Sequence, residues 1–402
     1  MVGGTAVTFR KALVVAQVSL SLLLLIGAGL FIRGLRNLHD LDPGFRVQSL
    51  ISFFINAPLN GYAKERSLQE YRLIQQTMDR LPGVQSSSMA VMSILEGDEW
   101  DQSFAVDTFN AKSGQKPDPH MNFLVPRYFK TLDAPLLLGR DFDARDVKGA
   151  PKVASVNEAF AKKYLGSPTN AMGHKIGPGG DAGTKTDVSI IGVARNTKYE
   201  KYERMRDRLP DVVYEPYEQM DFVLRVTCYE RTAGDPKQMF ESLRKTVHDI
   251  DPNLPVSHMK TMEKQLENSL VTDRLVASLS AAFGLPATVL AGIGLYGVMA
   301  YLVARRTREI GIRMALGAVP GHVLWLIMRE VLVLVAVGVA IAIPAAYWLT
   351  QLVSAQLCGI TPNDPLSIAV ATAGIAGVAV MAGYLPARRA TRIDPMNALR
   401  YE

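Results

Sequence analysis

Four long stretches of this 402-residue chain contain no charged side chain. About 20 apolar residues in a helix are enough to cross a lipid bilayer, and each stretch reaches that length. Within a bilayer the backbone must satisfy its own hydrogen bonds, so such a segment is expected to be helical. The sequence therefore predicts four transmembrane helices, at residues 12–32, 275–304, 331–352 and 365–387.

The first of these stretches also fits a second description, because Arg10 and Lys11 precede an apolar run as they would in a signal peptide. The apolar core of a signal peptide is only about 7–15 residues long, however, and the run at 12–32 exceeds that. No cleavage site of small residues follows it. We therefore expect an uncleaved membrane anchor.

The region between the first and second stretches, residues 33–274, has the composition of an ordinary folded domain. Short apolar runs typical of strands alternate in it with amphipathic, helix-like segments. Asn157 is placed to cap one of these helices, and the Gly- and Pro-rich segment 177–186 is typical of a hairpin tip. A large α/β domain inserted between transmembrane helices 1 and 2 is the prediction, with strands at 50–55, 152–156, 188–193 and 222–227 and helices at 67–81, 157–165 and 235–250.

The short loops predict the orientation, because Lys and Arg accumulate on the cytoplasmic side of a membrane. The loop 305–330 holds five arginines against two glutamates, whereas the loop 353–364 has no Lys or Arg. With the basic tails 1–11 and 388–402, this places both termini in the cytoplasm and the domain 33–274 outside. Arg33 and Arg36 do not follow the rule. The net charge of +6 is thus explained by membrane borders rather than by nucleic-acid binding.

Small residues at four-residue spacing predict close helix packing in the third and fourth spans. They are Gly338, Ala342 and Ala346, and Ala369, Ala373 and Gly377. The alternative is that Ala and Gly are merely common in such helices. No Asp, Glu, Lys, Arg or His lies inside a span, which argues against an ion channel or a proton-coupled transporter.

Three loops carry residues that could support chemistry. The segment 177–186 lacks the Gly-Lys pair of a phosphate-binding loop, so we expect no ATP hydrolysis by this chain. The acidic turn 141–146 departs from a calcium loop at Arg145 and Val147, and the acidic loop 96–101 could pair carboxylates for acid/base work. No metal-ligand spacing, cofactor motif or nucleophile elbow is present, and Cys228 and Cys358 form no disulfide framework.

The arginine-rich segment between the second and third spans is the strongest candidate for a docking site. Its charges suit pairing with a protein surface, and its apolar residues add contact area that anchoring to anionic lipid does not require. A helix after Ala304, a break at Gly317 and a new helix from Pro320 would form a rigid elbow. The candidate docking residues are Arg305, Arg306, Arg308, Glu309, Ile310, Gly311, Arg313, Ala315, Leu316, Gly317 and Ala318.

Several segments resemble the MacB/FtsX-type permeases of ABC transporters. The segment 308–318, Arg-Glu-Ile-Gly-Ile-Arg-Met-Ala-Leu-Gly-Ala, is similar to the signature of that family, and 386–400 is similar to its ending. Segments 125–132, 138–142, 156–161 and 191–193 resemble its periplasmic core domain. The chain looks most like the C-terminal unit of the duplicated permeases described from acidobacteria. A fragment, one half of a split gene and a complete single-unit permease all remain open.

The resemblance implies an inner-membrane subunit that pairs with a second permease unit and with separate ABC ATPase subunits, which bind ATP and Mg²⁺. ATP-driven closure of the ATPases would move the outer domain and drive export or efflux by mechanotransmission, with a periplasmic adaptor as a further partner. The family also suggests an alternative, a non-transport scaffold that regulates a cell-wall hydrolase. A third hypothesis from the residues is a membrane-tethered hydrolase that uses Asp98, Glu99 or Asp101. The substrate stays open.

Overall fold

The computed structural model describes residues 2–39, 42–108, 117–181, 183–197, 210–269, 271–315, 319–352 and 364–391. The chain forms two compact units, one of Met1–Asp40 with Val271–Glu402 and the other of Leu41–Leu270. We describe the first as the helical unit and the second as the α/β unit.

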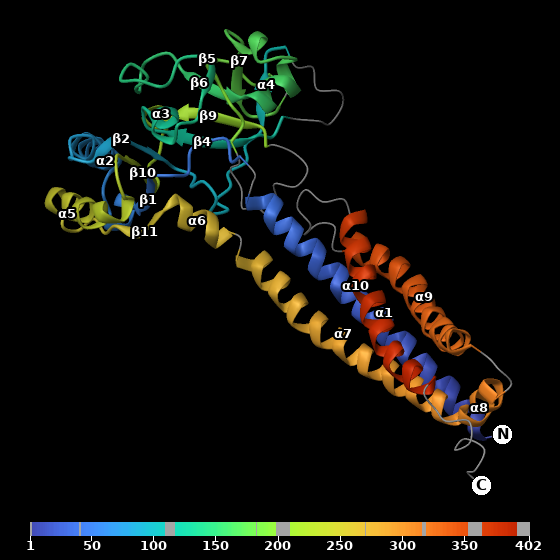
Figure 1. The fold of residues 1–402 in the computed structure, drawn as a ribbon. Helices are drawn as coiled ribbons and strands as arrows, with labels where there is room; N and C mark the ends of the chain where they lie inside the picture. The colour runs from blue at the N-terminus through green and yellow to red at the C-terminus, as the bar shows by residue number, and fades with distance from the viewer. Residues whose placement is uncertain are drawn as a thin grey trace. The chain divides into compact units, whose positions relative to one another are not determined.

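The helical unit is a bundle of long helices (Figure 1). Helix α1 packs along α7 and α9, and α10 packs against all three, so that α1 and α10 lie between α7 and α9. Aliphatic side chains from all four helices form one buried core. The described helices are α1 (Val2–His39), α7 (Val271–Arg305), α8 (Thr307–Ala315), α9 (Pro320–Leu352) and α10 (Pro365–Ala390).

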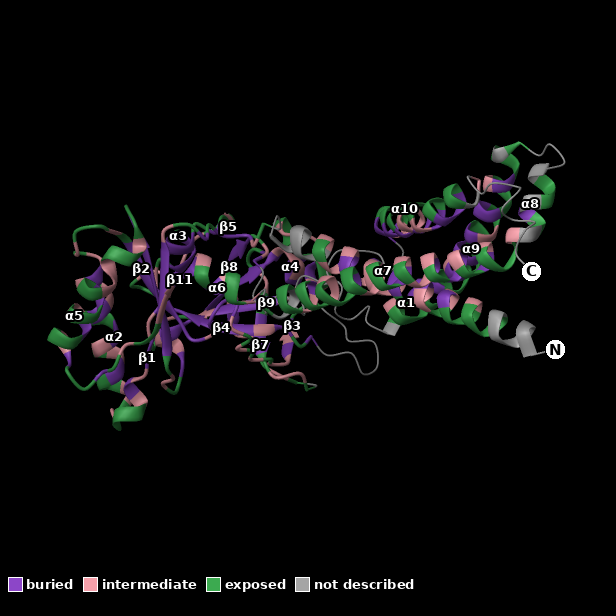
Figure 2. Cartoon of the chain, turned by 60° about the horizontal axis from the view of Figure 1, so that its bottom comes forward, coloured by how far each residue is buried: buried purple, intermediate pink, exposed green. Residues whose placement is uncertain are grey.

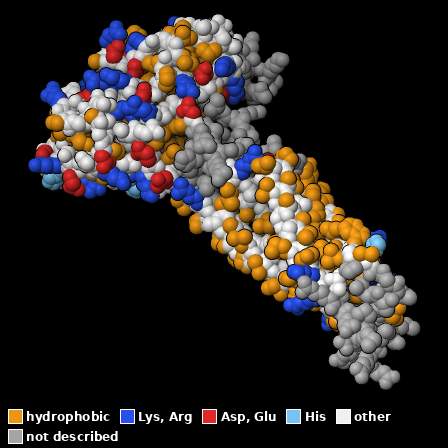
Figure 3. All heavy atoms as spheres, viewed as in Figure 1, with side chains coloured by type: hydrophobic (Ala, Val, Ile, Leu, Met, Phe, Trp, Pro, Cys, Tyr) orange, Lys and Arg blue, Asp and Glu red, His pale blue; other side chains and the backbone are white. Residues whose placement is uncertain are grey.

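Four of the described helices are long and apolar enough to cross a membrane, at Thr8–Arg33, Arg274–Arg305, Gly321–Gln351 and Pro365–Arg389. Buried positions run along their inner faces (Figure 2), whereas the face seen in Figure 3 is covered mostly by hydrophobic side chains. A lipid-facing surface accounts for large exposed apolar residues such as Phe283, Trp348 and Met381. Together with an α/β unit between α1 and α7, these helices confirm the predicted fold class.

Packing between α1 and α9 depends on a small residue, as predicted. A Cβ atom at Gly338 would lie 2.7 Å from Val18 Cγ1, and Ser19 Oγ donates a hydrogen bond of 2.9 Å to the Gly338 carbonyl. Ala342 and Ala346 follow on the same buried face. The small residues therefore bring the two helices close together.

The corresponding prediction for α10 is wrong. Ala369, Ala373 and Gly377 are exposed, and the bundle instead buries the face that carries Ala371, Ile375 and Ala379. Both sets repeat every four residues. Because α10 is rich in Ala and Gly on every side, small-residue spacing could not identify its packed face.

Arg33, which broke the orientation rule, has a local partner. Its guanidinium pairs with both carboxylate oxygens of Asp364, at 2.5 and 2.6 Å. Asp364 also caps α10 by accepting a hydrogen bond of 3.0 Å from Ser367 N. The charge of Arg33 is therefore balanced within the bundle and fastens the end of α1 to the start of α10.

The α/β unit is built on one sheet of eleven described strands in the order β11-β1-β10-β2-β4-β9-β6-β8-β7-β3, with β5 paired to β8. Most neighbours are antiparallel, and β4/β9 and β6/β8 are parallel. The strands are β1 (Leu50–Ile55), β2 (Val84–Ala90), β3 (Phe104–Val106), β4 (His120–Leu124), β5 (Leu136–Gly139), β6 (Val153–Asn157), β7 (Lys175–Pro178), β8 (Val188–Ala194), β9 (Val212–Pro216), β10 (Val226–Thr232) and β11 (Ser257–Thr261).

Helices pack on this sheet at several strands. Helices α2 and α5 pack together beside β2, α3 packs on β2 and β10, and α4 packs on β6, β8 and β9. The helices are α2 (Lys64–Met78), α3 (Tyr128–Leu132), α4 (Glu158–Leu165), α5 (Phe240–Ile250) and α6 (Met262–Ser269), with short 3₁₀ helices η1 (Ala57–Asn60), η2 (Thr169–Ala171), η3 (Tyr217–Gln219) and η4 (Pro236–Met239).

Most predicted elements of this unit are confirmed. Asn157 caps α4 by accepting a hydrogen bond of 3.0 Å from Phe160 N, and β7 and β8 form the expected hairpin. The helix predicted at 235–250 begins instead as η4 and becomes α-helical at Phe240. The strand predicted to start at Phe222 starts instead at Val226 as β10, because the backbone N–H and C=O of Leu224 bond to the hydroxyls of Tyr217 and Tyr71. The Phe222 ring stacks on Trp100, with centroids 5.5 Å apart.

Strand β10 carries a carboxyl group into the core of this unit. The Glu230 side chain is fully buried; one oxygen accepts a hydrogen bond of 2.9 Å from Ser87 Oγ and the other has no partner. Burial raises the pKa of Glu230 well above its usual value, with repulsion from Asp79 adding to the shift. The folded state therefore holds the proton more tightly than the unfolded state does.

We expect Glu230→Gln to stabilise the α/β unit increasingly as the pH rises. A raised folded-state pKa gives stability that is present below the unfolded pKa and is lost as the pH climbs through the folded pKa. Glutamine keeps the shape of the Glu230 side chain but cannot ionise, so it removes this loss of stability. Hydrogen exchange of β10 amides from pH 5 to 9 measures the difference, and equal pH slopes in the two proteins would contradict the burial argument.

Candidate functional site

Thr307 lies at the break between α7 and α8, and its hydroxyl bonds back to the end of α7. Thr307 Oγ1 donates hydrogen bonds to the carbonyls of Val303 and Ala304, at 3.1 and 2.9 Å. These carbonyls lie in the last turn of α7, where intrahelical partners run out. Helix α7 ends at Arg305 and α8 begins at Thr307.

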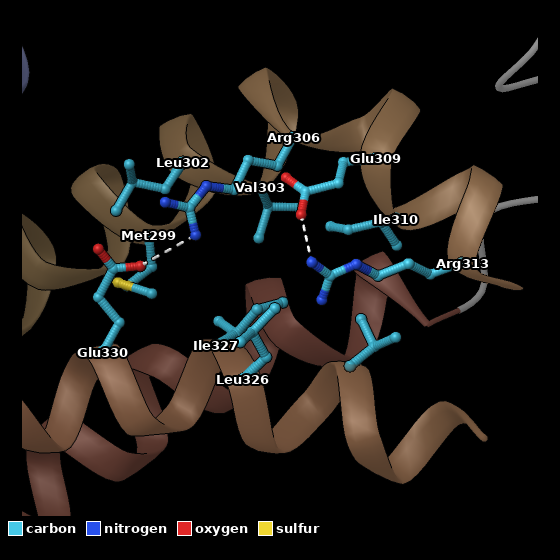
Figure 4. A pocket seen from close by; sticks show the side chains of 11 residues that line it. Met299, Leu302, Val303, Arg306, Glu309, Ile310, Arg313, Leu326, Ile327 and Glu330 are labelled. Carbon is cyan, nitrogen blue, oxygen red and sulfur yellow. Dashed lines mark hydrogen bonds and ion pairs between the residues drawn. The ribbon is translucent and has the colours of Figure 1, made fainter. Parts of the chain in front are cut away.

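Helix α8 packs on the bundle through Ile310, and a charged side flanks that residue. Ile310 is only 4% exposed and belongs to the bundle core with Val323 and Ile327, so it fastens α8 to α9. Glu309 and Arg313 form this charged side: they pair with each other at 2.5 Å and are each about half exposed. Both side chains point toward the space between α8 and α9 (Figure 4). This charged side is accessible to another protein.

One residue that joins several helices at this end of the bundle was not predicted from the sequence. Glu330, on α9, forms an ion pair with Lys11 of α1 and a second one, at 3.6 Å, with Arg306 at the corner between α7 and α8. Glu330 directly precedes the apolar run 331–352, and a carboxylate at the edge of a membrane span is expected to need a cationic partner. The sequence therefore did indicate that Glu330 has a partner. Its partners could not be identified, because Lys11 and Glu330 are 319 positions apart.

Two further cations at the same end bind aromatic residues of α7. The Arg10 guanidinium lies 4.5 Å from the centre of the Tyr301 ring, and Arg389 Nη1 donates a hydrogen bond of 3.1 Å to Tyr296 Oη. Basic residues at this end therefore join α1 and α10 to α7 as well as contributing charge.

The remaining candidate docking residues are placed less completely. Arg305 is exposed at the last position of α7. Arg308, Gly311 and Ala315 lie in α8, and α9 begins at Pro320 as predicted. Leu316, Gly317 and Ala318, with the proposed break at Gly317, lie outside the described residues.

A small hollow lies under α8, lined mostly by apolar side chains of α7, α8 and α9 (Figure 4). Its volume is about 20 Å³, roughly that needed for one water molecule. The hollow is therefore a packing defect beneath α8 rather than a substrate pocket.

Three carboxylates of the acidic loop 96–101 face basic side chains. Asp98 pairs with Arg225 at 2.5 Å, Asp101 with His120 at 2.5 Å, and Glu96 with Lys260. Paired acid and base carboxylates need to face a common substrate position, whereas Asp98 and Glu96 face separate cations and Asp101 faces the His120 ring.

The turn considered for calcium is held by arginines and by a helix. Arg140 makes two hydrogen bonds of 2.7 Å to Asp146, and Arg145 pairs with Asp143 at 2.7 Å. Burial raises the pKa of Asp141 to about 6, opposed by hydrogen bonds from backbone N–H groups of Phe142 and of α3. Among the described residues, no cluster of three or more His, Cys, Asp or Glu could hold a metal ion.

Comparison with known proteins identifies the family. The MacB-like periplasmic core domain matches residues 12–243, which is more than half of the chain, and the FtsX-like permease C-terminal domain matches residues 281–395. The chain belongs to the MacB/FtsX family of ABC transporter permeases. It is accordingly a multi-pass membrane protein with a transporter-permease fold.

Individual relatives cover this permease to different extents. A macrolide export ATP-binding/permease protein MacB of Chromobacterium violaceum is 34% identical over 81% of the chain and 50% of that protein. MacB of Syntrophobacter fumaroxidans is 34% identical over 41% of the chain and 23% of that protein. The ABC transporter permease YknZ of Bacillus subtilis is 26% identical over 72% of the chain and 71% of that protein. The chain thus spans half or less of these MacB relatives.

Proposed function

We propose that this permease couples ATP hydrolysis by a separate ABC ATPase subunit to movement of its α/β unit, and so drives export by mechanotransmission. Helix α8 is the docking site for the ATPase. The observation that carries this proposal is the charged side of α8, where Glu309 and Arg313 are each about half exposed beside Ile310, which packs in the bundle core. A helix fixed in this way transmits a push to α7 and α9.

The proposed assembly contains two permease units and two ATPases, with a periplasmic adaptor as a further partner. The relatives named ATP-binding/permease proteins support an ATPase partner for this chain. The hollow of about 20 Å³ under α8 and the lipid-facing apolar surface of the helices support a mechanism in which substrate does not pass between the spans.

Removing the charged side of α8 should weaken ATPase binding. We expect the double variant Glu309→Ala/Arg313→Ala to bind the ABC ATPase encoded nearest its gene about 100-fold more weakly, since losing one partner of an interfacial charge pair costs about 2–5 kcal/mol. Titration of detergent-solubilised full-length protein with the ATPase measures this.

The matched control for this experiment is Lys264→Ala/Glu267→Ala, which removes a similarly exposed pair on α6 of the α/β unit. Its ATPase affinity should equal that of the parent. Unchanged affinity in the α8 variant would place docking elsewhere. Binding of a cell-wall hydrolase to the α/β unit, with export unaffected by deletion of the gene, would favour the scaffold alternative.

The proposed orientation puts α8 in the cytoplasm and the α/β unit outside, because Lys and Arg gather at the α8 end of the bundle. Cysteines introduced at Ile312 in α8 (42% exposed) and at Leu59 in η1 (80% exposed) report on the two sides. In intact cells a membrane-impermeant maleimide should label residue 59 and leave residue 312 unlabelled. The reverse pattern would overturn the orientation and with it cytoplasmic docking.

A further inference from the structure

Glu330 occupies a junction between three parts of the helical unit. Its carboxylate contacts Lys11 on α1 and lies 3.6 Å from the guanidinium of Arg306, where α7 gives way to α8 (Figure 4). The Glu330 side chain is 21% exposed, so water only partly screens these two contacts.

Other acidic side chains do not duplicate this role. In the helical unit, the acidic side chains that the structure describes are Glu309, Glu330 and Asp364. Glu309 pairs within α8, and Asp364 pairs with Arg33 near the start of α10. Within the described part of the bundle, Glu330 is thus the carboxylate that connects the α7–α8 corner to α1 and α9.

Apolar packing alone holds α8 incompletely. Ile310 is its buried contact with the bundle core, and the hollow beside it is about 20 Å³ in volume. Side chains that line a void lack attractive contacts on that side. The ion pairs of Glu330 therefore carry a larger share of the attachment than they would beside a well-packed helix.

Loss of the Glu330 charge would do more than remove two attractions. Lys11 and Arg306 would then approach the same uncharged side chain, at an end of the bundle already rich in arginine. Like charges in a partly desolvated place repel each other. The corner would be driven away from α1 and α9.

We propose that Glu330 is a positioning residue that holds α8 in one orientation against α1 and α9, so that a push on α8 reaches the bundle. This inference rests on the proposed function, because it takes α8 as the ATPase-docking helix. The competing interpretation is that Glu330 only neutralises charge at the membrane border, in which case α8 stays in place without it.

Spin-label distances in the full-length protein, reconstituted in lipid nanodiscs, separate these interpretations. Cys358→Ser removes one native cysteine, and Cys228 is buried. One label pair replaces the exposed Ile312 of α8 and Trp325 of α9; a second replaces the exposed Phe283 of α7 and Val370 of α10 as a check on the bundle. The matched control is Glu309→Gln, which breaks an ion pair of α8 that does not involve α9.

We expect the 312–325 distance distribution to be narrow in the parent and to broaden in Glu330→Gln. The 283–370 distribution in Glu330→Gln, and both distributions in the Glu309→Gln control, should stay narrow. A narrow 312–325 distance in Glu330→Gln overturns the inference. If Glu330→Gln broadens both label distances, the 312–325 distance in Arg306→Gln tests the inference instead, because Arg306→Gln removes only the contact of Glu330 with the α7–α8 corner. A narrow 312–325 distance in that variant also overturns the inference.

The ATPase titration on the same variant distinguishes this inference from the proposed function. A loosened α8 with weakened ATPase binding supports both. A loosened α8 with unchanged ATPase affinity supports the role of Glu330 and overturns the placement of docking on α8.

Discussion

Arg231→Met is expected to destabilise the α/β unit by about 3 kcal/mol, because it removes the donor from one buried and two partly buried carbonyl groups. Arg231, near the end of β10, is 4% exposed. It donates hydrogen bonds to the carbonyls of Thr131, Gln48 and Arg46, at 2.7, 2.8 and 2.9 Å. No carboxylate lies in ion-pair contact with it among the described residues, so the guanidinium is held by backbone oxygens.

The size of this effect follows from two opposing contributions. A hydrogen bond to a charged group contributes about 1.5–3 kcal/mol net, and three are lost. Burial lowers the pKa of Arg231 to about 10, so the guanidinium stays charged at neutral pH and is costly to bury. Methionine avoids that cost, which offsets part of the loss.

The site matters because it fixes the segment that follows α1. Arg46 and Gln48 precede β1, and Glu263 of α6 accepts a hydrogen bond of 3.1 Å from Ser49 N in the same segment. Residues shortly after α1 and shortly before α7 are thus joined within the α/β unit. In the proposed mechanism, this joint receives the movement of both helices.

Hydrogen exchange of residues 46–49 and of β10 in the full-length protein measures the expected loss. Arg231→Lys should fall between parent and Arg231→Met, since an ammonium can donate to some of the three carbonyls. Arg225→Met is the matched control, because Arg225 forms an exposed pair with Asp98 that is worth about 0–1 kcal/mol. Parent-like protection in Arg231→Met would show that water replaces the guanidinium.

The membrane architecture could be predicted because lipid imposes a simple rule on the sequence. A span must be apolar along its whole length, so charge-free runs identify all four helices without knowledge of their packing. The Asn157 cap was predictable for a similar reason, since its hydrogen bond spans only three residues. Features set within one element, or by the surrounding solvent, are therefore visible in the sequence.

The contacts that organise the candidate site are not local. Glu330 and Lys11 meet only because α1 and α9 pack together, and the Ala- and Gly-rich α10 gave no single face from which to predict its packing. The same limit applies to Phe222, which lies before β10 and stacks its ring on Trp100. Tertiary packing decided all three cases.

Gly139→Ala is the second variant with a large expected effect, about 3 kcal/mol or more. Gly139 ends β5 with a φ of +82°, and a Cβ atom there would lie 2.1 Å from the carbonyl oxygen of Ile191 on β8. That oxygen cannot move freely, because it accepts a hydrogen bond of 3.1 Å from Arg140 N. The left-handed backbone costs an L-residue about 1–2 kcal/mol, and relief of the overlap adds about 1–3 kcal/mol.

Gly149→Ala separates these two contributions. Gly149 has a φ of +91°, but no atom lies within 4 Å of the position a Cβ would take. Both substitutions restrict the unfolded chain equally, so the difference between them isolates the overlap at Ile191. We expect Gly149→Ala to cost about 1–2 kcal/mol, the strain alone.

The destabilisation caused by Gly139→Ala should extend to α3. Asp141 follows Gly139 by two residues and accepts hydrogen bonds from the backbone N–H groups of Phe129 and Lys130 in α3. Displacing β5 from β8 moves this carboxylate and removes its contribution at the start of α3. Hydrogen exchange should therefore rise in α3 and β8 of Gly139→Ala and remain at the parent level in Gly149→Ala. Equal exchange in the two variants would mean that β5 accommodates the methyl group, and that the close approach of β5 to β8 does not require glycine.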